Sequence, residues 1–145
     1  MYFLVKVKYT KQLDNGAFKR VTESYLVGAN ASFTDAEARI YEELSSQIRG
    51  EFIIMKIDRY EIHDIFGYDD SEIWNLVKIS YTDLEDNREI KQRFLISAET
   101  VAKANERVIE CLAPVLFSWD VVSIQKSNIV EIFPIKTEDK DEPAN

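Results

Sequence analysis

The chain has 145 residues, of which 46% are hydrophobic and 30% are charged. This length suits one domain, or two small halves that share a core, and it excludes a multidomain enzyme. The composition is that of a folded protein. No apolar run approaches the roughly 20 residues that span a bilayer, and lysine interrupts the first apolar residues too soon for a signal peptide. We therefore expect a cytoplasmic protein without membrane contact.

The formal net charge is −8. Much of it lies in an acidic join at residues 67–72 and in a tail at 136–145, which we expect to be disordered. The rest of the chain is only mildly acidic. Since a net negative charge does not attract nucleic acid, we expect no nucleic-acid partner, although a local basic patch stays open as an alternative.

The first elements in chain order are two strands and a hairpin turn. Residues 3–9 alternate between apolar and polar side chains, which predicts a half-buried strand. Asn15-Gly16 predicts the turn because primed turns need positive φ angles. A second strand is predicted at about residues 20–27.

A helix and a long extended run follow. Ser32 or Thr34 can cap a helix whose apolar residues repeat every four positions, and Gly50 ends it. The run at 52–66 is rich in β-branched and aromatic residues. It is too long for one average strand, so we expect a bend or bulge near residues 58–60.

The second half repeats this plan. It predicts strands at 73–84 and 88–97, a helix at 98–112 that ends before Pro114, and a last strand at 118–133. Residues 4–10 recur 72 positions later, and the offset falls to 69, 68 and 67 through the later elements. These changes of offset all fall in turns. The pattern indicates an internally duplicated ββαβ unit with repeats at about 1–66 and 73–133.

Each repeat alone would bury only a marginal core. Packing the two repeats around a pseudo-twofold axis would bury both apolar faces. We therefore expect one α+β domain over residues 1–135, with about six mostly antiparallel strands and two helices. Its edge strands make a homo-oligomer or a protein partner plausible.

The residue types for common catalytic centres are scarce. The chain has one cysteine and one histidine. Cys111 lies in the apolar pattern of the second helix, and nothing in the spacing brings it to His63. Glycine-rich phosphate loops are absent from the sequence. We expect no catalytic constellation, no metal and no cofactor, although arginine, tyrosine and carboxylates alone can catalyse, so an enzyme is the third alternative.

Five basic residues are candidates for binding an anionic ligand. Arg39 and Arg107 occupy equivalent places on the two predicted helices, where symmetric guanidinium groups would suit a phosphate or carboxylate. The alternative is an ion pair along each helix, with Glu43 and Glu110 respectively. A second basic locus is formed by Lys56, Arg59 and Lys126 on the third strands.

Aromatic residues that do not match across the repeat are candidates for a partner contact. These residues are Tyr60, Tyr68 and Trp74, close to the join. The matched aromatic residues favour symmetric core packing instead. Asp69 and Asp70 are either solvated acidic residues or ligands for a divalent cation, and solvation is the commoner case.

Five segments carry a resemblance to a known family. They are residues 4–9, 21–27, 32–39, 50–52 and 129–134. On them the chain resembles a domain-of-unknown-function family that is widespread in Bacteroidota and in their phages and mobile elements. The resemblance covers the chain to about residue 134 and implies such an origin, but it implies no activity.

Two function classes fit these observations best. The first is a non-catalytic binding protein for a small anionic ligand; in a phage this would be a sponge that removes a nucleotide signal of host defence from the host cytoplasm. The second is a structural or interaction protein of a phage particle or a replication complex, which would use its sheet edges.

Overall fold

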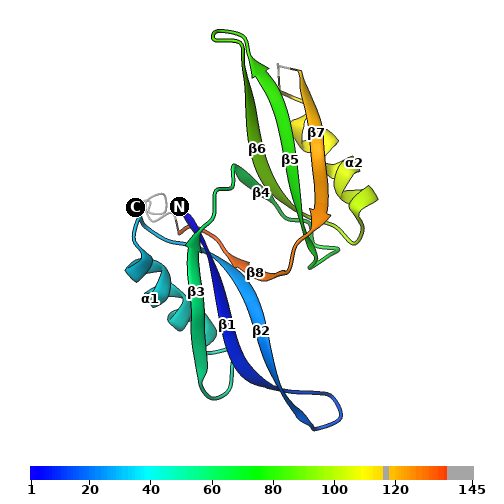
Figure 1. Cartoon of the computed structure of the whole chain (residues 1–145). Coiled ribbons are helices and arrows are strands. Elements are labelled where there is room, and N and C mark those ends of the chain that lie inside the picture. Colours follow the sequence, from blue (N-terminus) through cyan, green and yellow to red (C-terminus); the bar gives the residue numbers. More distant parts are fainter. Residues whose placement is uncertain (116–117, 137–145) are drawn as a thin grey trace, which may run out of the picture. The chain divides into compact units, whose positions relative to one another are not determined.

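The computed structural model describes residues 1–115 and 118–136. They form two compact units (Figure 1): the first comprises Met1–Tyr60 and the chain from Glu131 on, and the second comprises Glu61–Val130. One four-stranded sheet and one helix belong to each unit. Within the residues described, no helix combines the length and the hydropathy that crossing a membrane requires. The predicted disordered tail lies, from residue 137 on, outside the described residues.

The first sheet has the strand order β3-β1-β2-β8. Its strands are β1 (Tyr2–Gln12), β2 (Phe18–Gly28), β3 (Phe52–Arg59) and β8 (Ile129–Phe133). Strand β1 pairs antiparallel with both β2 and β3. A turn joins β1 to β2 at the predicted place, but it is not the predicted primed turn: Gly16 has a positive φ of 84°, whereas Asn15 does not, and the N–H of Gly16 donates to the carbonyl of Leu13.

Helix α1 (Phe33–Leu44) follows β2 and contacts β1, β2 and β3 on one face of this sheet. Ser32 is its N-cap, because its Oγ accepts a 3.0 Å hydrogen bond from the backbone N–H of Asp35. After the helix, Gly50 has a φ of 86° and turns the chain toward β3.

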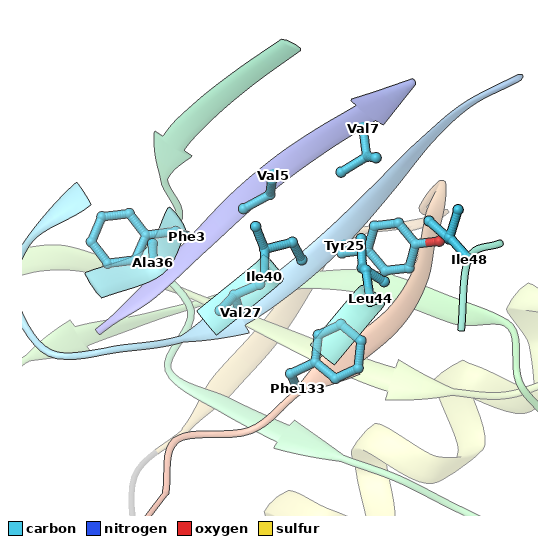
Figure 2. Packing of buried hydrophobic residues seen from close by; sticks show 10 residues of the cluster. All are labelled: Phe3, Val5, Val7, Tyr25, Val27, Ala36, Ile40, Leu44, Ile48 and Phe133. Atoms are coloured by element: carbon cyan, nitrogen blue, oxygen red, sulfur yellow. The ribbon is translucent and has the colours of Figure 1, made fainter. Parts of the chain in front are cut away.

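The first core lies between α1 and the sheet. Figure 2 shows Ile40 and Leu44 pointing toward side chains of β1 and β2, and both residues are fully buried. Phe133 of β8 stacks on Tyr25 with ring centroids 6.0 Å apart, so a strand from the far end of the chain belongs to this core. Each such buried side chain stabilises the fold by about 1.5–3 kcal/mol. The cluster comprises Phe3, Val5, Val7, Tyr25, Val27, Ala36, Ile40, Leu44, Ile48 and Phe133.

The second sheet has the strand order β4-β6-β5-β7. Its strands are β4 (Asp64–Phe66), β5 (Trp74–Asp83), β6 (Arg88–Ser97) and β7 (Trp119–Lys126). Strand β5 is antiparallel to β6 and β7, and β4 is parallel to β6. Helix α2 (Val101–Leu112) begins later than predicted, because Thr100 caps it by accepting a hydrogen bond from the N–H of Lys103. Val108 and Leu112 pack in the core of this unit.

Strands β3 and β7 each contain a bulge. Lys6 pairs with Lys56 but Val7 pairs with Ile54, so Met55 is an extra residue in β3. A corresponding shift between Lys78 and Ile79 leaves an extra residue at Val122 of β7. The bulge in β3 lies earlier than the expected position near residues 58–60. Bulges bend an edge strand and hinder its pairing with another chain.

The α+β class and the two helices agree with the prediction, but the number of strands does not. The described residues form eight strands in two sheets, where about six strands were predicted. The runs at 52–66 and 118–133 each form two strands that belong to different sheets. The chain leaves the first unit after Tyr60 and returns to it after Val130, which interrupts both runs.

The two sheets have the same strand order when β1 is matched with β5, β2 with β6 and β3 with β7. The fourth place in each sheet is taken by a strand from the other half of the sequence: β8 beside β2, and β4 beside β6. We call β4 and β8 the exchanged strands. Phe66 of β4 stacks on Phe94 at 5.8 Å, as Phe133 of β8 stacks on Tyr25.

Replacing a core residue tests the packing of α1. Ile40→Ala should lower the free energy of unfolding by about 2–5 kcal/mol, because it leaves a cavity in the first core. Ile109→Ala is the matched control: Ile109 of α2 is 50% exposed, and its loss should cost less than about 0.5 kcal/mol. Urea unfolding followed by circular dichroism measures both. Equal destabilisation by the two variants would contradict this assignment of the core.

Candidate functional site

Arg39 lies on α1, and its side chain is only 12% exposed. Its Nη1 donates hydrogen bonds to the backbone oxygens of Gly28, at 2.8 Å, and of Pro134. Its Nε and Nη2 both donate to the Glu43 carboxylate at 3.1 Å, so the ion pair along the helix is present. The guanidinium group therefore joins the end of β2 to the residue that follows β8.

Arg107 lies on α2 and is 6% exposed. Its Nη1 donates to the backbone oxygen of Ser97 at 2.6 Å, and its Nη2 donates to the Asp70 carboxylate. The guanidinium carbon lies 4.1 Å from the centroid of the Tyr68 ring. Its carboxylate partner is thus Asp70 in the acidic join and not Glu110 on its own helix.

The two arginines make equivalent contacts in their units. Each donates to the last carbonyl of a second strand, β2 or β6, and each holds the segment that follows an exchanged strand. We call these contacts the Arg39 latch (Gly28, Arg39, Glu43 and Pro134) and the Arg107 latch (Tyr68, Asp70, Ser97 and Arg107). Arg39 makes four hydrogen bonds to oxygens of the protein, and Arg107 makes two and is almost completely buried. The latches therefore hold strands together, and neither guanidinium group is well placed to bind a ligand.

The segments after the exchanged strands pass close to the ends of β2 and β6. A Cβ atom on Gly28 would lie 2.4 Å from the backbone nitrogen of Ile135, so this approach requires glycine. In the second unit, Ser97 stands at the corresponding place, and its Oγ accepts a 2.6 Å hydrogen bond from the backbone N–H of Tyr68.

Pairing shifts pKa values in the Arg107 latch. The hydrogen bond from Arg107 holds the pKa of Asp70 below its ordinary value. The Sγ of Cys111 lies 3.3 Å from the Tyr68 hydroxyl, and this hydrogen bond, together with burial, raises the pKa of Tyr68 to about 12. Cys111 therefore contacts a tyrosine, whereas His63 packs against Phe94 with ring centroids 5.3 Å apart.

A cavity of about 250 Å³ lies beside the Arg39 latch. Its lining includes Arg39 and Lys136 together with the carboxylates of Asp35 and Glu42. Lys136 lies 3.8 Å from Glu42, and Arg39 is already bonded to Glu43 and to carbonyl oxygens. Since the charges of the lining balance, the cavity does not select an anion. Among the described residues, no group of three or more histidine, cysteine or acidic residues is arranged to hold a metal ion.

The three residues of the second predicted basic locus do not lie together in the structure. Lys56 and Arg59 both lie on β3 but on opposite faces of the sheet, because Lys56 pairs with Lys6 and Arg59 pairs with the core residue Phe3. The guanidinium carbon of Arg59 lies 5.5 Å from the centroid of the Phe33 ring. Lys126 is exposed at the end of β7 in the second unit.

The predicted aromatic contact residues are partly buried within their own units. The backbone N–H of Tyr60 donates to the carbonyl of Tyr2 at 2.9 Å. Tyr68 packs against the second core as well as under Arg107. The Trp74 ring lies against Gly67, where a Cβ atom would be 3.3 Å from it.

Basic residues gather on the face of the first sheet that α1 does not cover, which we call its open face. Val5 and Val7 point into the core, so Lys6 and Lys8 point to the open face because side chains alternate along a strand. The strand register adds Lys56 of β3, opposite Lys6, and Arg20 of β2, opposite Thr10.

The second sheet has a basic open face as well. Lys78 lies between the core residues Val77 and Ile79 and therefore points away from α2. The register places Arg93 opposite Lys78 and Lys91 opposite Ser80. These faces were not predicted from the sequence: the alternating lysines of β1 are visible there, but their cross-strand neighbours are not.

One comparison with known proteins finds a match. The model of a domain of unknown function, DUF4494, matches residues 1–135. The chain belongs to this family. No curated protein and no solved structure matches it. The matched residues of the DUF4494 domain include both sheets, both exchanged strands and both latches.

The Arg107 latch predicts a pH-dependent stability of the DUF4494 domain. Asp70→Asn should lower the melting temperature at neutral pH, since Arg107 loses its charged partner. The pKa of Asp70 in the folded state is lowered from 3.8, so its contribution is present above pH 3.8 and is lost as the pH falls through the folded-state value. The difference between the wild type and the variant should therefore disappear in acid.

Melting curves recorded by circular dichroism from neutral to acidic pH measure this difference. Asp69→Asn is the matched control, because Asp69 takes no part in the latch and its loss should change the melting temperature little at any pH. An Asp70→Asn variant that melts with the wild type at neutral pH would show that the latch does not stabilise the fold.

Proposed function

We propose that this DUF4494 domain is a non-catalytic binding protein that holds an anionic ligand on the open faces of its sheets. The observation that carries the proposal is the cross-strand pair of Lys6 and Lys56, with Lys8 beside it. Like charges directly opposite each other destabilise a sheet. In the described part of the chain, no carboxylate lies within 4.0 Å of the Lys6 or Lys8 ammonium group, whereas the Lys56 ammonium group lies 3.4 Å from the exposed Asp58 carboxylate. A bound anion would relieve this repulsion.

A nucleotide is the first small ligand to consider, since lysine ammonium groups bind phosphate well. The resemblance to a family of Bacteroidota, their phages and mobile elements supports a setting in which such a protein sequesters a nucleotide signal in the host cytoplasm. The structure changes which basic residues are candidates for binding the ligand. Lys56 stays a candidate contact because its side chain is exposed, although its ammonium group lies 3.4 Å from the Asp58 carboxylate. Arg39 and Arg107 are buried and engaged in the latches.

An internal duplication is part of the proposal, together with the pseudo-twofold relation expected from the sequence. Three observations support the duplication: the matched strand orders, the bulges at Met55 and Val122, and the two latches. A duplicated unit would provide two open faces of similar construction, and therefore two places for the same kind of ligand.

A protein-interaction role is the second candidate. Ile53 and Met55 lie on the edge strand β3, and each is 53% exposed. Exposed apolar residues on an edge strand favour pairing with another chain, although the bulge at Met55 opposes it. A homo-oligomer or a protein partner would use this edge.

Thermal shifts with anionic compounds test the proposed function. Nucleotides, cyclic dinucleotides or ADP-ribose derivatives that bind should raise the melting temperature, because a ligand of the folded state stabilises it by about 2.7 kcal/mol at a hundred times its Kd. Lys6→Gln with Lys56→Gln should remove the shift. Lys11→Gln with Lys19→Gln should retain it, since these exposed lysines pair with each other on the other face of the same sheet.

Equal loss of the shift in both double variants would contradict the proposed site. If no anionic compound, oligonucleotides included, shifts the wild type, the binding role fails and the interaction role becomes the better candidate. Light scattering of the same samples then measures whether the chain associates with itself.

A further inference from the structure

The open faces are basic although the chain as a whole is acidic. The sequence contains 18 basic and 26 acidic residues. Within strands β1–β3 and β5–β7, the strand register assigns seven basic residues to the open faces: Lys6, Lys8, Arg20, Lys56, Lys78, Lys91 and Arg93. The same strands carry three acidic residues on these faces: Asp58, Glu89 and Asp120. Because salt screens charges beyond about 8–10 Å, these faces attract anions regardless of distant carboxylates.

The positive charge of the two open faces comes from residues at different positions of the repeat. Lys6 and Lys78 occupy matched places in the repeat. Lys8 corresponds to Ser80, however, and Lys91 and Arg93 correspond to Thr22 and Ser24. The core does not require basic residues there, because these side chains point away from it. A basic open face is therefore common to both units even though the individual residues differ.

The spacing of the charges favours an extended ligand over a compact one. Lys6 and Lys8 are two residues apart on one strand, so their Cα atoms are separated by about 7 Å. Small-molecule sites are concave, whereas the cavity described in the first unit is lined by α1 and not by these lysines. Phe18, which is 70% exposed, lies two residues before Arg20 on the same face of β2 and offers a ring for stacking.

We infer that the open faces bind single-stranded nucleic acid, with phosphates on the lysines and a base stacked on Phe18. The inference rests on the proposed function and names its ligand class. A line of phosphates matches a line of lysines, and unpaired bases leave their faces free for an aromatic side chain. The expectation that nucleic acid is not a partner relied on the net charge of −8, whereas these faces carry a local excess of positive charge.

Fluorescence anisotropy with labelled oligothymidylate and oligouridylate tests the inference on the full chain. The logarithm of the affinity should fall linearly with the logarithm of the salt concentration, with a slope of about −0.7 per phosphate contact. Lys6→Gln with Lys8→Gln should weaken binding about tenfold and reduce the slope by about 1.4. The matched control, Lys11→Gln with Lys19→Gln, should leave both unchanged.

Two further variants separate the parts of the site. Phe18→Leu should weaken binding about fivefold or more without changing the salt slope, because stacking releases no counterions. On the second sheet, Lys78→Gln with Lys91→Gln should act like the first pair, and Lys103→Gln with Lys126→Gln is its control. The variant Lys6→Gln should melt no lower than the wild type, since it removes a like-charge pair, so a loss of binding is not a loss of folding.

The outcomes distinguish this inference from the proposed function. If mononucleotides bind as tightly as the oligonucleotides, or a duplex of equal length binds more tightly, the ligand class is wrong and the anionic site stands. If the open-face variants and their controls lose binding equally, the location is wrong. If no anion binds at all, both the inference and the proposed function fail.

Discussion

In each unit, a helix arginine bonds the last carbonyl of one strand and holds the segment that follows a strand from the other half of the sequence. Arg39 does this for β8, and Arg107 does it for β4. These strands are short, so their own ladder hydrogen bonds are few. The stacked rings of Phe133 on Tyr25 and of Phe66 on Phe94 add apolar contact at the same places. The exchanged strands also cover β2 and β6, which would otherwise be unpaired sheet edges.

Each unit has a single helix, which covers only one face of its sheet. A sheet with one covering helix has an apolar face toward the helix and another face without one. On the covered face, side chains such as Val5 and Val7 are fully buried and leave no room for charge. On the open face, several of the alternate residues are basic, among them Lys6, Lys8 and Lys56, although Leu26 on the same face is fully buried. The strand alternation that builds the core thus also gathers the positive charge, and the acidic residues lie mostly elsewhere.

Local patterns in the sequence predicted much of the fold. The position of the turn at Gly16, the Ser32 cap and the buried stripe through Ile40 and Leu44 are all present, because each depends on residues close together in the chain. The long runs were predicted less well. Their composition favours strands along their whole length, and nothing local indicates that β3 and β4, or β7 and β8, lie in different sheets.

The sequence by itself determined the α+β class, the two helices and the hairpins, because hydrophobic period, capping and turn chemistry are short-range properties. The tertiary structure alone decided which strand completes each sheet and which side chains become neighbours across strands. Arg39 and Arg107 show this difference: their positions on the helices were predictable, but their partners Pro134 and Asp70 were not. Those partners are set by the long-range packing of β8 and β4. The free energy of this packing depends on residues far apart in the chain.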